Sequence, residues 1–361
     1  VISYDDGVTH WYRTKGDADG LQCPEELVRQ AAARKGAPLV LDARSPECQR
    51  AVGGPLPQPV RSLVAVPLHD PFEPLGLVLL TSKLAPAEIS QVDRELLLSL
   101  ASAAAMRVRT LLLAEEASER RRLEEELELA RRIQVALLPR KLPELEGYEI
   151  LGKNLPFSGV SGDYYMVQER RGGWECVFSV ADVCGKGVAA SLLMASLEAL
   201  SAAPIREGLD PDEVFFRVSQ LLYERTPPER FATAFLAVLE PKTGRVRFAN
   251  AGHNPALLLP ATGEREWLHA TGIPLGLFAG RGYGMGRLEL APGDALFLYT
   301  DGVTEARGPL GEEFGPERFA EVCGRYLHCG LERLTEALDA QIEAFTGGEP
   351  PEDDRTFLAV R

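Results

Sequence analysis

The chain has 361 residues, of which 45% are hydrophobic and 25% charged, which is an ordinary globular composition with room for two domains. Its formal net charge is −14 and it has no dense run of Lys and Arg, which excludes a nucleic-acid groove. Charged residues or Gly interrupt the apolar stretches before the roughly 18 residues that cross a bilayer, so no membrane span is expected.

The cysteines form no Cys-x-x-Cys pair, and their positions are Cys23, Cys48, Cys176, Cys184, Cys323 and Cys329. Scattered cysteines in a chain of this size are typical of reduced thiols, which predicts a cytoplasmic protein. The sequence opens with Val1-Ile2-Ser3-Tyr4, a pattern typical of the interior of a strand. We therefore expect the chain to start inside a longer protein.

Residues 1–110 are predicted to form a first domain of short strands and helices. Two apolar strands, residues 61–68 and 75–81, are joined by a turn that contains Pro71, which predicts a hairpin. Ser90-x-x-Asp93 then opens an apolar-periodic helix in the manner of a capping box. This order resembles the C-terminal half of a GAF domain, which implies an N-terminally truncated α/β sensor that takes a small-molecule or protein signal.

Residues 111–140 are predicted to be a helical linker, because residues 111–138 lack Gly and Pro and are rich in Glu, Arg and Leu. A stripe of mostly apolar residues recurs at alternating spacings of four and three along this helix, at Leu123, Leu127, Ala130, Gln134 and Leu137. That spacing favours a coiled-coil homodimer. The alternative is a solvated helix that packs one stripe on its own domains.

Residues 141–361 switch to many short strands with helices near 188–202, 211–226, 316–326 and 331–345. Strands grouped around helices without a β-α-β rhythm predict a layered α+β fold.

Acidic residues follow or precede apolar strands beside glycine-containing turns at four points of this region. They are Asp163, Asp182, Asp301 and the pair Asp353-Asp354. Each alone is typical of a turn. Together, at one edge of a sheet, they would repel one another unless a cation compensates their charge.

The donors are oxygens with no Cys or His pairing, which predicts Mg²⁺ or Mn²⁺ rather than zinc. Two such ions about 3.5–4 Å apart activate water for in-line attack on phosphorus. The sequence therefore predicts a two-metal phosphoryl hydrolase.

A series of ordered motifs carries a more specific resemblance. They are Ala130-x-x-Ile133-Gln134-x-x-Leu137-Leu138-Pro139, Gly162-Asp163-Tyr164-Tyr165, Ala181-Asp182-Val183-Cys184-Gly185-Lys186-Gly187, Phe231-Ala232-Thr233, Asn250-Ala251-Gly252-His253-Asn254-Pro255, Pro274-Leu275-Gly276, Tyr299-Thr300-Asp301-Gly302-Val303-Thr304-Glu305 and Asp353-Asp354-Arg355-Thr356. The set resembles the SpoIIE/RsbU-type branch of the metal-dependent, 2C-like (PPM) serine/threonine protein phosphatases, which implies an αββα sandwich.

The resemblance implies a bimetal centre and the residues that build it. Its catalytic carboxylates are Asp163, Asp182, Asp301 and Asp353, and its metal ligands are these four with the carbonyl of Val183 and Asp354 as the alternative to Asp353. Substrate-binding residues are not identified. For Lys186, a solvated turn residue is favoured over a contact to phosphate. For His253, a side chain that fixes loop geometry is favoured over a general acid.

The chain departs from the family pattern at three positions: Ser161 replaces Gly, Met166 replaces Asp and Cys184 replaces Ser. The loss of an acidic group at Met166 removes an outer contact, but all core carboxylates remain, so activity is expected.

The resemblance implies a phosphorylated STAS-type anti-anti-sigma factor as substrate and partner in bacterial partner-switching signalling. Regulation is expected to pass from the N-terminal domain through the helical linker. The alternative function is a non-catalytic scaffold that uses the phosphatase fold only to bind a partner.

Overall fold

A computed structural model of the chain describes residues 30–31, 37–51, 60–69, 74–83, 85–157, 159–227, 229–262 and 264–361. Contacts divide the chain into two units, Val1–Leu123 and Glu124–Arg361, and each is described by itself. The division falls within one helix, α3 (Gln91–Val135). Cys23 and the predicted strand at Val1-Ile2-Ser3-Tyr4 lie outside the described residues.

The first unit contains a three-stranded antiparallel sheet in the order β1-β2-β3. Its elements are β1 (Leu39–Asp42), α2 (Pro46–Ala51), β2 (Ser62–His69), β3 (Pro74–Ser82) and the 3-10 turn η1 (Pro86–Glu88). The predicted hairpin is confirmed, because β2 pairs with β3 along its length. Its expected turn at Pro71 lies outside the described residues.

Strand β2 is buried on both faces. Leu63 and Ala65 enter one hydrophobic cluster, whereas Val64 and Val66 enter another that includes Ala101 of α3. Alternate side chains of a strand point to opposite faces, so α3 covers one face of this sheet. A covered three-stranded sheet does not identify a GAF-like domain, and that assignment stays a prediction.

Helix α3 is a single helix of 45 residues, where the sequence predicted one helix after Ser90 and a separate linker helix. The capping box at its start is confirmed. The Ser90 amide donates to Asp93 Oδ2 at 2.9 Å and the Asp93 amide donates to Ser90 Oγ at 3.2 Å. On the proposed coiled-coil seam, Leu123 and Leu127 are exposed, but Gln134 is buried within the second unit. The end of the seam therefore packs on the chain itself.

By length and composition alone, α3 and α4 (Val188–Arg206) each contain a stretch apolar enough to cross a membrane. In α4 this stretch includes Leu193, Met194 and Leu197, which belong to the protein core. Core helices meet the same criterion, so these stretches are weak evidence for a span.

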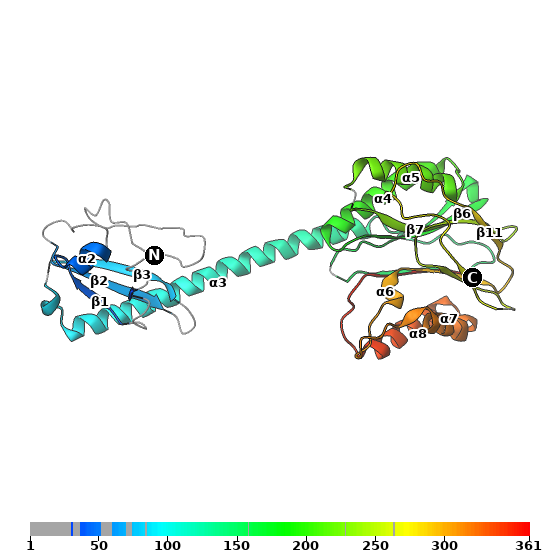
Figure 1. Cartoon of the computed structure of the whole chain (residues 1–361). Helices are drawn as coiled ribbons and strands as arrows, with labels where there is room; N and C mark the ends of the chain where they lie inside the picture. The colour runs from blue at the N-terminus through cyan, green and yellow to red at the C-terminus, as the bar shows by residue number, and fades with distance from the viewer. Residues whose placement is uncertain are drawn as a thin grey trace. The chain divides into compact units, whose positions relative to one another are not determined.

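The second unit contains two five-stranded antiparallel sheets (Figure 1). One has the order β11-β8-β7-β6-β5 and the other β10-β9-β12-β13-β4. The strands are β4 (Ile150–Leu155), β5 (Tyr164–Arg170), β6 (Glu175–Val183), β7 (Ala232–Glu240), β8 (Arg245–Ala251), β9 (Ala256–Leu259), β10 (Glu266–Leu268), β11 (Gly286–Glu289), β12 (Ala295–Tyr299) and β13 (Arg355–Val360).

Helices of this unit agree with the predicted ones within a few residues. They are α4, α5 (Pro211–Arg225), α7 (Gly315–Tyr326) and α8 (Leu331–Thr346), with short turns at η2 (Arg171–Gly173), α6 (Asp301–Thr304) and η3 (Leu327–Cys329). Figure 1 shows α4 and α5 over the sheet of β6 and β7, and α7 and α8 over the other sheet.

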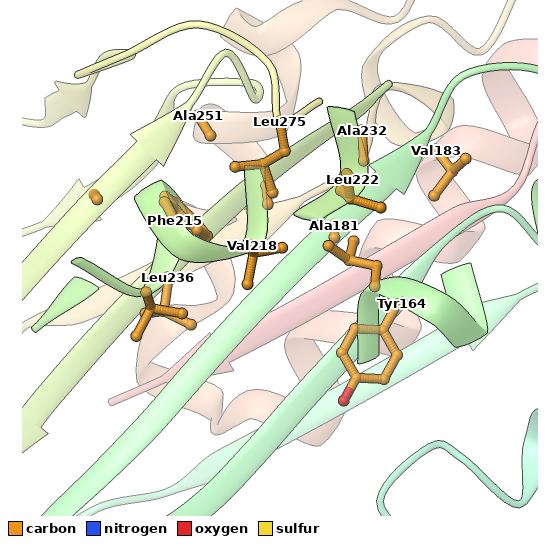
Figure 2. Close-up of a cluster of buried hydrophobic side chains, with 14 of the residues drawn as sticks. Tyr164, Ala181, Val183, Phe215, Val218, Leu222, Ala232, Leu236, Ala251 and Leu275 are labelled. Atoms are coloured by element: carbon orange, nitrogen blue, oxygen red, sulfur yellow. The ribbon is translucent and has the colours of Figure 1, made fainter. Parts of the chain in front are cut away.

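Three hydrophobic clusters hold these layers together. One joins the first sheet to α4 and α5, and Figure 2 shows Phe215, Val218 and Leu222 of α5 in this cluster. A second lies between the sheets, with Phe178 and Phe235 facing Leu358, and a third joins the second sheet to α7 and α8. The four layers agree with the predicted αββα sandwich.

Candidate metal centre

The loop that carries Asp163 is fixed by side chains that bond three successive backbone amides. The Ser161 amide donates to Gln134 Oε1 at 2.8 Å, and the Gly162 amide donates to Asp354 Oδ2 at 2.7 Å. The Asp163 amide donates to Ser161 Oγ at 3.0 Å. These groups come from α3, from the segment before β13 and from the loop itself, so distant parts of the sequence hold Asp163 in place.

The Asp163 carboxylate is buried and bonded on one oxygen. Thr300 Oγ1 and Thr356 Oγ1 both donate to its Oδ2, at 2.6 and 2.7 Å. Burial raises the pKa of Asp163 well above its usual range, and the charge of Asp182 raises it further, although the two hydroxyl donors oppose the shift. A buried carboxylate with such neighbours requires a cation or a proton.

Asp182 lies near the end of β6, and the structure brings it close to the other acidic residues. Burial raises its pKa to about 7, with further contributions from the charges of Asp301, Asp353 and Asp354, while a hydrogen bond with Asp163 opposes the shift. Burial also raises the pKa of Asp301 to about 6, with contributions from Glu305 and Asp353. The four predicted acidic points therefore interact at one place.

The two neighbouring aspartates before β13 have different surroundings. Asp354 is buried, and its two oxygens accept the amides of Phe157 at 2.7 Å and Gly162 at 2.7 Å. Asp353 is 38% exposed and pairs with Lys186 Nζ at 2.8 Å. Backbone amides therefore occupy both carboxylate oxygens of Asp354. Asp353 can instead bind a metal ion by giving up its ion pair with Lys186. This difference favours Asp353 as the ligand.

The Val183 carbonyl lies close to the Asp163 loop. A Cβ on Gly162 would lie 3.2 Å from this carbonyl oxygen and 3.3 Å from Ala190 Cβ, so a larger residue would have to push these neighbours away by a few tenths of an ångström. The expected backbone ligand is therefore adjacent to the expected carboxylate ligand.

In the part of the chain that the structure describes, no group of three or more His, Cys, Asp or Glu side chains is already arranged to hold a metal ion. Asp353 is turned to Lys186, and one oxygen of Asp163 is bonded to hydroxyl groups. The donor chemistry nonetheless fits hard divalent cations, since every candidate is an oxygen, and burial together with neighbouring carboxylates raises the pKa values of Asp163 and Asp182. Metal binding would require Asp353 to leave Lys186.

His253 connects the two sheets near these carboxylates. Its Nε2 lies 3.0 Å from the carbonyl oxygen of Tyr299, and its Nδ1 lies 2.8 Å from Thr233 Oγ1. The carbonyl can only accept, so Nε2 donates and Nδ1 accepts the hydroxyl proton. Thr233 stands opposite Asp182 in the β6-β7 pairing, and Tyr299 precedes Thr300. His253 therefore fixes the local geometry, as the sequence favoured.

Several residues that support the site were not assigned by sequence reasoning. Gln134 was placed on the helix seam, and Thr300 and Thr356 belonged to quoted motifs without a role. The available signal for the two threonines was their position in the sequence: Thr300 directly precedes Asp301, and Thr356 lies two residues after Asp354. Of the departures, Ser161 supplies the oxygen that accepts the Asp163 amide, and Cys184 Sγ accepts the Phe231 amide at 3.2 Å.

Comparisons with known proteins identify a family. Residues 172–361, just over half of the chain, match the family described as Stage II sporulation protein E (SpoIIE). The chain is 30% identical over 265 residues to Protein IcfG of Synechocystis sp., covering 65% of this chain and 41% of that protein. It is 30% identical over 188 residues to the Phosphoserine phosphatase RsbU of Bacillus subtilis, covering 51% of this chain and 55% of that protein.

The chain thus spans about half the length of the curated relatives it matches. Among solved structures, it is similar to the SiaA-PP2C domain of Pseudomonas aeruginosa, with 26% identity and a TM-score of 0.60. That match covers 68% of this chain and 99% of the solved one, so the PP2C-like fold extends over the second unit.

Proposed function

The chain belongs to the SpoIIE family, and from this membership and the carboxylate cluster we propose that it is a metal-dependent protein serine/threonine phosphatase. It hydrolyses phosphoserine or phosphothreonine on a partner protein. The observation that carries the proposal is the convergence of Asp163, Asp182, Asp301 and Asp353, far apart in the sequence, at one place in the fold.

In this proposal Asp163, Asp182, Asp301, Asp353 and the carbonyl of Val183 hold two Mn²⁺ or Mg²⁺ ions. When bound, the ions would supply Lewis-acid activation of water and stabilise the negative charge on the oxygens of the phosphoryl group during in-line attack. The chain itself orients the ligands. Thr300 and Thr356 both donate to Oδ2 of Asp163, and Asp354 accepts the Gly162 amide, so the loop that carries Asp163 is held in position.

Release of phosphate from phosphoserine peptides by the Mn²⁺-loaded chain tests this function, with Asp182→Asn as the inactive control. Calorimetry with Mn²⁺ tests the metal separately. A chain that binds no Mn²⁺ and releases no phosphate would contradict the proposal and favour the non-catalytic scaffold.

The proposed substrate is a phosphorylated STAS-type anti-anti-sigma factor, and the proposed setting is partner-switching signalling in the cytoplasm. Support comes from the similarity to RsbU, which is named a phosphoserine phosphatase. Mass spectrometry of a phosphorylated STAS protein incubated with the chain would detect the loss of its phosphoryl group. Turnover of generic phosphopeptides without turnover of any STAS protein would contradict this substrate.

We further propose that the N-terminal region regulates the site through α3. The side-chain amide of Gln134 accepts the Ser161 amide and donates to the Ser161 carbonyl, two residues before Asp163. A shift of the helix end would therefore move the loop that carries Asp163. We expect Gln134→Ala to alter Mn²⁺ affinity and turnover, whereas Ile133→Ala, at a neighbouring side chain that is 60% exposed, should alter neither.

A homodimer through α3 completes the proposal. Leu123 and Leu127 are 55% and 39% exposed on the predicted seam, and exposed leucines at this spacing favour pairing with a second copy of the helix. Light scattering should show a dimer that Leu123→Glu with Leu127→Glu dissociates. Leu310→Glu, at a leucine that is 93% exposed elsewhere, is the matched control. A monomeric wild-type chain would contradict the dimer.

A further inference from the structure

The loop of residues 184–187 follows the metal-ligand candidates Asp182 and Val183 and involves two cationic side chains. Lys186 belongs to the loop, and Arg230 contacts it. Lys186 pairs with Asp353, as described above, and also donates to the Glu352 carbonyl at 2.6 Å. Arg230 comes from the segment before β7, and its Nη1 donates to the Cys184 carbonyl at 3.2 Å. Lys186 therefore joins the loop to the segment before β13, and Arg230 joins the segment before β7 to the same loop.

The segment that carries Arg230 is bound tightly to this loop through Cys184. The Cys184 amide donates to the Phe231 carbonyl at 3.1 Å, and the Phe231 amide donates to Cys184 Sγ at 3.2 Å. The Cys184 thiol in turn donates to the Glu229 carbonyl at 3.3 Å. The backbone on both sides of Arg230 is thus fixed relative to the loop that follows Asp182.

The Arg230 guanidinium lies against the backbone of Gly185. A Cβ at Gly185 would lie 2.6 Å from Arg230 Nη1, and Gly185 has a φ of +91°, so a larger residue there would be strained and would push the guanidinium away. The glycine therefore serves two purposes, the turn of the loop and the close approach of Arg230.

Arg230 has donor capacity to spare. Within the described residues no carboxylate forms an ion pair with it, and its one side-chain hydrogen bond, to the Cys184 carbonyl, uses one of five N–H groups. The remaining N–H groups form a fork that suits the oxygens of a phosphoryl group.

The charge balance of the proposed metal centre indicates a use for the positive charge of Arg230. In the proposed centre two divalent ions only neutralise four carboxylates, whereas a phosphoryl ester carries about −1.5 to −2 charges at neutral pH. Ground-state binding of the dianion therefore needs further positive charge beside the metals, and Arg230 and Lys186 supply it. Lys186 becomes available when Asp353 turns from it to a metal.

We propose that Arg230, with Lys186 as its second member, forms the subsite that binds the phosphoryl group of the substrate. The inference rests on the proposed phosphatase function and names the residues that recognise its substrate. It also gives a reason for the close approach of Arg230 to Gly185, which the turn itself does not require.

The test is calorimetric titration of the full, Mn²⁺-loaded chain with inorganic phosphate, which needs no turnover. Loss of a charge-assisted pair should weaken phosphate binding by Arg230→Gln about 10- to 100-fold. Arg230→Lys keeps the charge and should lose less. Arg325→Gln, which removes the same charge from an exposed residue on α7, should bind phosphate as the wild type does.

A parallel Mn²⁺ titration without phosphate separates recognition from loop support. Unchanged Mn²⁺ affinity in Arg230→Gln, combined with weaker phosphate binding, supports the subsite. If Mn²⁺ affinity falls as much as phosphate affinity, Arg230 only holds the Cys184 carbonyl and the proposal is overturned. It is also overturned if Arg230→Gln binds phosphate normally or if the wild type binds none.

Failure of the proposed hydrolysis would look different. A wild-type chain that binds Mn²⁺ and phosphate but hydrolyses no phosphopeptide would reject the catalytic function while the Arg230 comparison still decides the subsite. If only Lys186→Gln, and not Arg230→Gln, weakened phosphate binding, the assignment of Arg230 would be wrong.

Discussion

The acidic cluster has a fixed side and an adjustable side. On the fixed side, Asp163 is held by two threonine hydroxyls and Asp354 by two backbone amides, and both carboxylates are buried. On the adjustable side, Asp353 is partly exposed and pairs with a lysine, and Asp301 begins a short helical turn. Asp182 lies between the two sides and interacts with both.

The difference shows two ways in which a metal-free chain can tolerate neighbouring carboxylates. Buried carboxylates cannot rearrange freely, so their positions are set during folding by hydroxyl and amide donors from neighbouring strands. The partly exposed carboxylate of Asp353 pairs with Lys186 until a metal ion competes for it. Substitutions on the two sides should therefore have different consequences for stability and for metal binding.

The largest effect is expected at the residue that both sides share. Asp182→Asn removes the charge of a proposed metal ligand without changing volume, so turnover should fall to the background rate in a phosphopeptide assay. The same substitution should stabilise the metal-free chain. The pKa of Asp182 is raised to about 7, so its favourable contribution is complete below about pH 4 and is lost as the pH rises through 7.

Thermal unfolding at pH 8 in the presence of a chelator measures this gain, which we expect to be on the order of 2 kcal/mol. At pH 4 the wild type and the variant should be nearly equal in stability, because the carboxyl is then protonated. A variant that is less stable than the wild type at pH 8 would show that Asp182 is not a source of repulsion in the metal-free fold.

The next effect separates the two neighbouring aspartates. Asp353→Asn should lower Mn²⁺ affinity by more than the roughly 10- to 100-fold that loss of an outer-shell partner causes, with little change in melting temperature. Asp354→Asn should destabilise the fold by about 1–3 kcal/mol, because the new amide group cannot accept both backbone N–H groups. Calorimetry and thermal unfolding on both variants measure the contrast, and an exchange of the two outcomes would assign the ligand to Asp354.

Much of this centre was predictable from local patterns. Asp182 and Asp301 lie at the ends of apolar runs that the structure makes strands, and the four main helices lie close to the expected ranges. Strand ends beside glycine turns are recognisable in one sequence, because periodicity and turn chemistry are local properties. These properties predict which carboxylates to consider.

What local patterns could not provide is the partner of each side chain. Gln134 fits a helix seam by spacing, but spacing does not say whether a face meets a second helix or the chain's own loop, and here it bonds Ser161. Thr300 and Thr356 meet Asp163 only because β12 pairs with β13, a register set by long-range packing. The N-terminal sheet is likewise too short to identify its family.

A smaller effect should follow from loosening the fixed side. Thr300→Val keeps the shape but removes one of the two hydroxyl donors to Asp163. We expect Mn²⁺ affinity to fall about 10- to 100-fold, in the range for partners that orient a ligand. Thr335→Val is the matched control, since this buried hydroxyl bonds only the backbone of its own helix, α8. Equal Mn²⁺ affinities in the two variants would mean that Asp163 needs no such support.

The smallest effect on turnover is expected from protonation of His253, whose ring bonds Thr233 and the Tyr299 carbonyl. Burial lowers its pKa to about 4, and both ring nitrogens are occupied, so it has no proton to exchange near neutral pH. The pH profile of phosphopeptide hydrolysis between pH 6 and 9 should therefore have the same limbs in His253→Gln as in the wild type. A limb that disappears in the variant would restore the general-acid role.

His253 should instead affect stability in acid. The unfolded imidazole titrates near pH 6.5, so the favourable contribution of the neutral ring is complete above that pH and is lost as the pH falls through about 4. We expect the wild type to lose about 3 kcal/mol over this window beyond what His253→Gln loses. Denaturant unfolding of both chains at pH 7 and pH 4 measures the difference, and because the imidazole bridges Thr233 and Tyr299, its protonation would break the same link that keeps Asp182 and Asp301 within reach of each other.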